Sequence, residues 1–78
     1  MHGNTMNLRL GDLMLSLVEQ HLVILTAVEE RYQQKKYYYQ FLTGRFAGEY
    51  GADLEEYALI MRDAFIKQYG HLYGNANR

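Results

Sequence analysis

The chain has 78 residues, which is enough for one domain with one modest hydrophobic core. It contains no cysteine, so disulfide-stapled secreted scaffolds and cysteine-ligated zinc sites are excluded. Eight basic and nine acidic side chains give a formal net charge of −1. Because this charge supplies no positive field for a phosphate backbone, we expect no nucleic acid among the partners.

The N-terminal part of the chain does not have the pattern of a signal peptide. Residues 1–7 are polar and predict a flexible segment, with Asn7 as the preferred cap of a following helix. No small-residue cleavage pattern follows the apolar run at 13–28. That run is also shorter than the roughly 20 residues that a bilayer requires, and polar residues 19–21 interrupt it. We therefore expect a cytoplasmic protein, and leave contact with a membrane surface open.

Residues 12–43 contain neither glycine nor proline, and eleven of the sixteen residues in 13–28 are apolar. Polar positions recur there every three to four residues, which is the period of a helix with a narrow wet face. A helix with so broad an apolar arc has to be covered by other helices, by a second copy of the chain or by lipid. One long helix and two helices joined by a bend at 29–34 both fit this pattern.

The second half of the chain predicts a connector and then a final helix. Residues 43–52 hold three of the seven glycines and predict a turn. Asp53 and Glu56 have the spacing of a capping box, so we expect a helix to begin at Asp53. Gly70 then suits a left-handed helix end, followed by a flexible tail at 74–78. The sequence thus predicts a single all-helical domain over 1–78, a compact bundle of three to five amphipathic helices.

No residue set in the chain specifies a reaction. His21 lies within the apolar run, but the spacings of helical metal sites, His-x-x-x-His and Glu-x-x-His, are absent, so we interpret it as a core or edge histidine. The acidic pairs at 29–30 and 55–56 have simpler roles on a solvated face and at a helix start. We expect a non-enzymatic protein without catalytic residues, cofactor or metal site.

The candidate interaction surface combines apolar positions of the long segment with a basic and aromatic cluster. Tyrosine suits interfaces, because it joins an apolar ring to a polar tip. Three consecutive tyrosines cannot share one helix face, so at least one of them is exposed or in an interface. The candidate residues are Leu15, Leu22, Lys35, Lys36, Tyr37, Tyr38, Tyr39 and Phe41.

The arrangement over Leu8 to Tyr73, with an apolar first helix and a capped last one, resembles the saposin-like group and, within it, small bacterial proteins that promote secretion. This resemblance implies lipid or membrane contact and a role in protein export, with no catalytic residues. The alternative is a soluble homo-oligomeric adaptor or regulator, whose long first segment pairs with another protein or with a second copy of itself. The length of the uninterrupted segment 12–43 favours this alternative.

Overall fold

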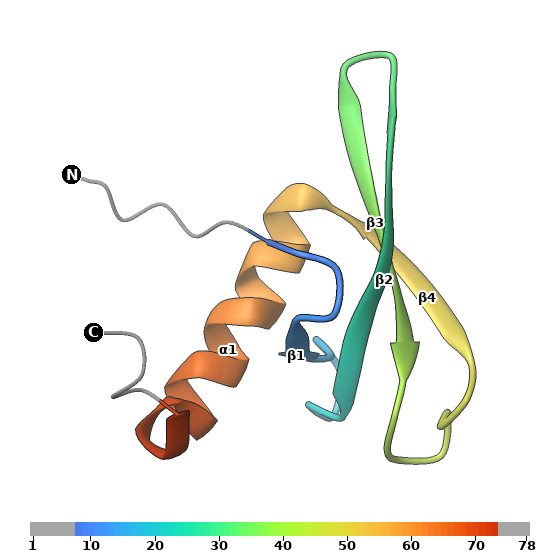
Figure 1. Cartoon of the computed structure of the whole chain (residues 1–78). Helices are drawn as coiled ribbons and strands as arrows, with labels where there is room; N and C mark the ends of the chain where they lie inside the picture. The colour runs from blue at the N-terminus through green and yellow to red at the C-terminus, as the bar shows by residue number, and fades with distance from the viewer. Residues whose placement is uncertain (1–7, 74–78) are drawn as a thin grey trace, which may run out of the picture.

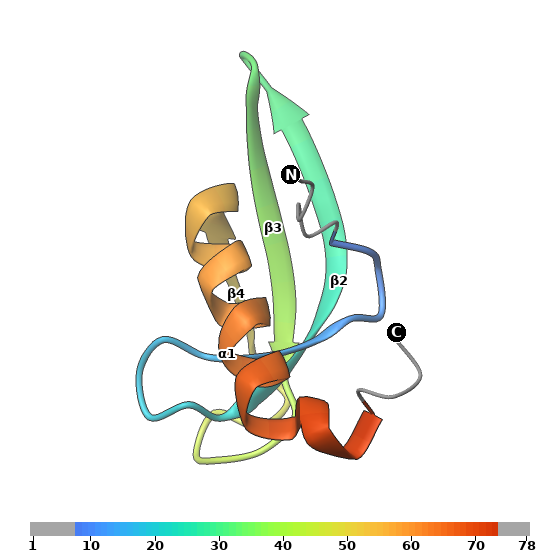
Figure 2. The ribbon, with the colours of Figure 1, turned by 90° about the vertical axis from the view of Figure 1, so that its left-hand side faces the viewer.

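The computed structural model describes residues 8–73, with side chains for residues 8–70, as a four-stranded antiparallel sheet and one helix. The elements in chain order are β1 (Leu13–Leu15), β2 (Leu22–Arg31), β3 (Gln34–Phe41), β4 (Tyr50–Leu54) and α1 (Glu55–Tyr73). The strands follow one another in the sheet in the same order, β1-β2-β3-β4. Figure 1 shows α1 beside the sheet, and Figure 2 shows the helix lying in front of it.

The predicted all-helical bundle is wrong, because residues 12–43 form strands rather than one or two helices. The run of apolar residues at 22–28 is rich in valine, isoleucine and leucine, and a strand buried on one face has much the same composition as a buried helix. The break between β1 and β2 uses positive φ angles at Glu19 (66°) and Gln20 (49°). Since neither residue is a glycine, the sequence contains no clear turn signal there.

The resemblance to the saposin-like group, and to its secretion-promoting member PAS factor, is also wrong. Saposin-like proteins are built from amphipathic helices, whereas the described residues contain one helix packed on an antiparallel sheet. The resemblance rested on the arrangement of predicted helices alone. With those helices replaced by strands, it no longer supports lipid contact or export.

The three consecutive tyrosines lie on β3, where successive side chains point to opposite faces of the sheet. Tyr37 and Tyr39 point toward α1 and are 4% and 7% exposed, whereas Tyr38 is half-buried on the other face. Tyr39 pairs with Leu25 of β2, and Tyr37 with Val28. A bulge at Thr26 adds one residue to β2 between these pairs, so Leu25 and Val28, three residues apart, face two tyrosines that are two residues apart.

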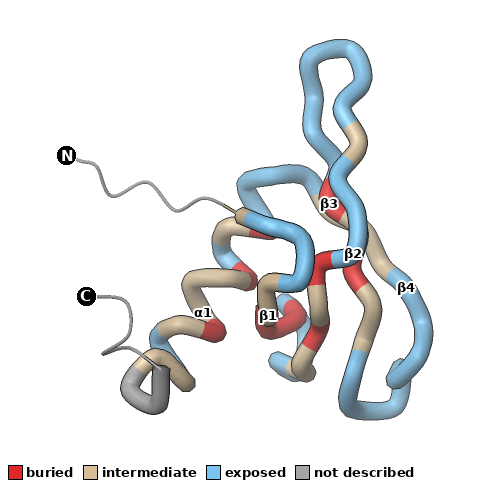
Figure 3. Tube along the Cα trace, viewed as in Figure 1, coloured by how far each residue is buried: buried red, intermediate tan, exposed pale blue. Residues whose placement is uncertain are grey.

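The hydrophobic core lies between α1 and one face of the sheet, where the buried residues cluster in Figure 3. Ala58, Met61 and Phe65 recur with helical spacing and form the buried side of α1. The sheet contributes Met14, Val23, Leu25, Tyr37 and Tyr39 to the same core. The final helix predicted from the sequence is confirmed, but its ends differ, since Asp53 belongs to β4 and the helix continues past Gly70.

Helix α1 is fastened to the opposite end of the described chain. Arg62 Nη1 donates a hydrogen bond to the carbonyl oxygen of Leu13, at 2.8 Å, and Arg62 Nε lies 3.9 Å from Asp12 Oδ2. Both partners adjoin or belong to β1, which is the element that α1 contacts most. The predicted flexible segments 1–7 and 74–78, with the cap at Asn7, lie outside the described residues.

The β2–β3 hairpin extends past the other elements, as Figure 1 shows. Its outer part, residues 29–36, is called here the hairpin arm. Arg31 and Gln34 form the last pair, and Tyr32 and Gln33 make the turn with φ angles of 51° and 66°. A two-residue turn with both φ angles positive is of type I′, which matches the twist of the strands it joins.

Candidate interaction site

The loop between β1 and β2 is closed by a buried serine. Ser16 Oγ donates to the carbonyl oxygen of Val18, at 2.7 Å, and accepts a hydrogen bond from the backbone N–H of His21, at 2.9 Å. Ser16 is 6% exposed, while Leu17 and Val18 are 47% and 71% exposed. The loop therefore turns its polar group inward and its apolar side chains outward, which is the reverse of what solvent alone would favour.

The loop between β3 and β4 meets the first loop at His21. Gly44 has a φ of 86°, and a Cβ atom on it would lie 2.6 Å from the imidazole ring of His21. No side chain fits in that space, so the ring packs directly on the glycine backbone. The connector predicted at 43–52 is confirmed for 43–49, where Gly44 and Gly48 have positive φ angles, whereas residues 50–52 belong to β4.

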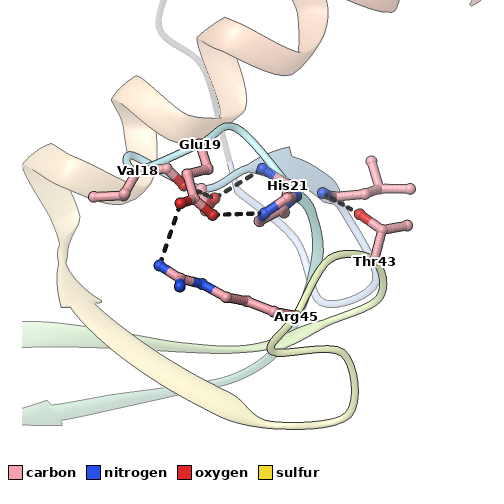
Figure 4. A network of polar contacts seen from close by, with 7 residues as sticks. Val18, Glu19, His21, Thr43 and Arg45 are labelled. Carbon is pink, nitrogen blue, oxygen red and sulfur yellow. Dashed lines mark hydrogen bonds and ion pairs between the residues drawn. The ribbon is translucent and has the colours of Figure 1, made fainter.

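A network of polar contacts joins the two loops, as Figure 4 shows. Glu19 Oε1 lies 2.9 Å from Nε2 of His21, and Arg45 Nη2 donates to Glu19 Oε2 at 3.2 Å. The backbone N–H of Leu22 donates to Thr43 Oγ1 at 3.0 Å. The Glu19 carboxylate thus contacts His21 at the end of the first loop and Arg45 in the second. The positive φ at Glu19 is a strained conformation that this arrangement holds in place.

Between these loops and the sheet lies a cavity of about 270 Å³, called here the loop hollow. It is lined by residues of β3, β4 and both loops: Ser16, Leu17, Val18, Tyr39, Phe41, Phe46 and Asp53. Its aromatic side chains form a row, with ring centroids 5.7 Å apart for Tyr39 and Phe41 and 5.6 Å apart for Phe41 and Phe46. Phe46 is 40% exposed, so the apolar lining is open to solvent at its rim.

A tyrosine and an aspartate meet at the sheet side of the loop hollow. The hydroxyl of Tyr39 donates to Asp53 Oδ2 at 2.6 Å. The Tyr39 ring crosses Gly51, its partner across the β3–β4 ladder, where an added Cβ would lie 2.7 Å from the ring. Burial raises the pKa of the Tyr39 hydroxyl far above its usual value, and the hydrogen bond to Asp53 raises it further. Tyr39 is therefore a neutral donor to a carboxylate.

In the structure, the eight candidate surface residues indicated by the sequence do not form one surface. Leu15, Tyr37 and Tyr39 are buried, and of these only Tyr39 also lines the loop hollow. Leu22 and Phe41 are half-buried, and Phe41 lines the loop hollow.

The remaining candidates, Lys35, Lys36 and Tyr38, lie on β3, the two lysines within the hairpin arm and Tyr38 just beyond it. Both lysines are exposed, and Lys36 Nζ lies 5.7 Å from the centre of the Tyr38 ring. Lys36 and Tyr38 line a wider cavity of about 430 Å³ together with Glu29, Arg31, Tyr32, Gln34 and Leu54. The charges of this lining are mixed, and Arg31 pairs with Glu29 at 2.9 Å. The arm thus presents charges of both signs rather than one uniform charge to a ligand.

Sequence reasoning missed five residues of the loop hollow, among them Ser16. Leu17, Val18 and Phe46 were expected to be part of helices or connectors, and Asp53 was interpreted as a helix cap. The available signal was the polar stretch 19–21 between two apolar runs, which indicates a turn as well as it indicates a wet helix face. The meeting of 16–18 with Phe46 depends on strand pairing, which no local pattern in these segments specifies.

Comparison of the chain with models of protein families, with curated proteins and with solved structures finds no match in any of the three. Within residues 8–73, no helix is long and apolar enough to cross a membrane. Among the described side chains, no group of three or more histidine, aspartate or glutamate residues is arranged to hold a metal ion. The candidate site therefore rests on the geometry of the loop hollow.

Proposed function

We propose that this protein is a non-enzymatic, cytoplasmic binding module that recognises a segment of another protein at the loop hollow. The observation that carries the proposal is the convergence of exposed apolar side chains from two loops, Leu17, Val18 and Phe46, on one cavity. Exposed apolar groups gathered around a hollow are typical of binding sites, whereas scattered ones are normal on any surface.

The rigidity of the surrounding loops supports the same proposal. Ser16 closes the first loop, and Glu19 links it through Arg45 to the second. Loops held by such hydrogen bonds should lose less conformational entropy on binding than loops without them. The membrane hypothesis, by contrast, depended on the apolar arc of a helix at 13–28, and this segment forms β1, a loop and β2.

The test is selection from a displayed library of random peptides, followed by affinity measurement of the enriched peptides. The double variant Leu17→Ser/Val18→Ser removes the apolar rim at exposed positions. Ile60→Ser is the matched control, because Ile60 is a similarly exposed apolar side chain (53%) on α1 that does not line the loop hollow. We expect the double variant to bind selected peptides at least about tenfold more weakly, and the control to bind within about twofold.

Three results would overturn the proposal. The first is that no peptide is enriched, or that the double variant binds as well as the unchanged protein. The second is a dimer, seen by sedimentation across a dilution series, that the double variant abolishes, because a second copy then occupies the loop hollow. The third is binding to anionic phospholipid vesicles that the same variant abolishes, which would assign the surface to lipid.

A further inference from the structure

Asp53 differs from the other partly buried carboxylates of the described residues. Four aspartate and glutamate side chains are half-buried, at positions 12, 29, 53 and 63. Asp12 lies 3.9 Å from Arg62, Glu29 lies 2.9 Å from Arg31, and Asp63 lies 3.2 Å from Lys67. Within residues 8–70, no ion pair joins Asp53 to a basic side chain, and its hydrogen-bond partner is the neutral hydroxyl of Tyr39. Asp53 thus carries a charge that this part of the fold does not balance.

The surroundings of Asp53 suit a cation on an apolar stem. The carboxylate lines the loop hollow beside the aromatic row of Tyr39, Phe41 and Phe46. Aromatic faces attract ammonium and guanidinium groups, and a carboxylate near them adds direct charge attraction. Arg45 stacks 5.0 Å from the Phe46 ring centre but pairs with Glu19, and it does not line the loop hollow.

The size of the loop hollow limits what it holds. Its volume of about 270 Å³ is slightly below the range of about 300 to 1,000 Å³ that is usual for small-molecule sites. One long side chain fits such a space better than a cofactor does. The exposed rim at Leu17 and Val18 would then contact apolar residues that flank this side chain.

We propose that the loop hollow takes a basic side chain, lysine or arginine, from the partner segment, with its cationic end at Asp53 and its methylenes along the aromatic row. This inference rests on the proposed function and adds the chemistry of the ligand. Tyr39 holds the carboxylate in place through its hydroxyl and is a positioning residue. Gly51 gives the Tyr39 ring the room to reach Asp53.

The test uses peptides selected by the unchanged protein and resynthesised with arginine, lysine, citrulline or norleucine at the enriched basic position. Citrulline keeps the shape of arginine without its charge, and norleucine keeps the stem of lysine. We expect the charged peptides to bind at least tenfold more tightly than their neutral counterparts. Asp53→Asn keeps an oxygen that can accept from Tyr39 and should abolish this difference. Asp63→Asn, which removes a charge on α1 at a similarly buried position, should preserve it.

A measurement on the unchanged protein guards against misfolding of Asp53→Asn. Protons of the bound arginine or lysine stem should shift upfield in NMR spectra, because they lie against aromatic rings. Equal binding of charged and neutral peptides, or the absence of these shifts, would overturn the inference. If those peptides still lose affinity for Leu17→Ser/Val18→Ser, the proposed function survives and only the basic ligand is wrong. If the double variant binds them normally, both proposals fail.

Discussion

Single residues decide whether the two loops can meet. Gly44 and Gly48 lie in the same loop with nearly equal φ angles of 86° and 92°. Their surroundings differ, since a Cβ on Gly44 would lie 2.6 Å from the His21 ring, whereas nothing lies within 4 Å of one on Gly48. The two positions therefore separate backbone strain from steric contact.

Alanine at either glycine should cost about 1–2 kcal/mol of unfolding free energy, because an L residue is strained at positive φ. Gly44→Ala should lose about a further 1–3 kcal/mol of unfolding free energy, since the new methyl group displaces His21 from a packed contact. Urea denaturation of both variants measures the difference. Equal losses would show that the His21 ring moves aside freely and that the loops are not packed against each other.

Because of Tyr39, the free energy of unfolding should depend on pH in the alkaline range. Its raised pKa means that the folded state holds the phenolic proton more tightly than the unfolded state does. The stabilisation is complete below about pH 10 and declines as the pH rises toward the folded-state pKa, by up to about 1.4 kcal/mol per pH unit. Tyr39→Phe should lose less stability between pH 9.5 and pH 11 than the unchanged protein, as measured by urea denaturation.

The absolute stability of Tyr39→Phe at pH 7 provides the control for this comparison. It should fall by about 1.5–3 kcal/mol, because the variant removes a hydrogen bond to the Asp53 carboxylate. Parallel loss of stability in both proteins above pH 9.5 would contradict the role assigned to Tyr39. Tyr37, whose pKa is also raised by burial and by Glu55, is present in both proteins and cancels in the difference.

At the scale of elements, the turn of the hairpin arm is built from unfavourable residues. Tyr32 and Gln33 both have positive φ, which asparagine and glycine adopt at far lower cost. The double change Tyr32→Asn/Gln33→Gly should therefore stabilise the protein by about 1 kcal/mol, seen as a higher Tm. Because Tyr32 is 94% exposed, little packing is lost. An unchanged or lower Tm would mean that the turn has another conformation in solution.

The sequence predicted elements well only where local signals agree with tertiary packing. The final helix was found because the capping-box spacing of Asp53 and Glu56 marks a helix start, and the residues that follow do pack on the sheet through one face of α1. Residues 13–28 were assigned wrongly because the reversal at Glu19 and Gln20 uses no glycine. The strand character of 37–39 was also present in the sequence, since tyrosine favours strands, but it was outweighed by the length of the segment without a helix breaker.

The candidate site was harder to predict than the elements. Tyr39 and Phe41 were named for an interface, and both line the loop hollow, but the other lining residues come from 16–18, 46 and 53. These segments meet only through the antiparallel pairing of four strands. A helical assignment of 12–43 places them far apart, so the error in fold class carried over directly to the site.

At the scale of the whole molecule, stability should be uneven. The core residues Val23, Leu25 and Tyr39 lie under α1, whereas residues 29–31 and 34–35 of the hairpin arm pair only with each other in the sheet. Hydrogen exchange measured by NMR should show backbone amides of the arm exchanging much faster than those at Val23 and Leu25. Uniform protection along β2 would contradict this gradient and indicate that something covers the arm in solution.

Helix α1 follows all four strands in the chain, yet it packs chiefly on β1, the first of them, and Arg62 reaches Leu13 across 49 residues. During synthesis on the ribosome, the sheet therefore emerges before the element that covers its apolar face. Met14, Val23 and Leu25 remain accessible to chaperones or to other nascent chains until Met61 and Phe65 have left the exit tunnel. The sheet thus stays uncovered until α1 has been synthesised, and termination before α1 would release a sheet that is open to aggregation.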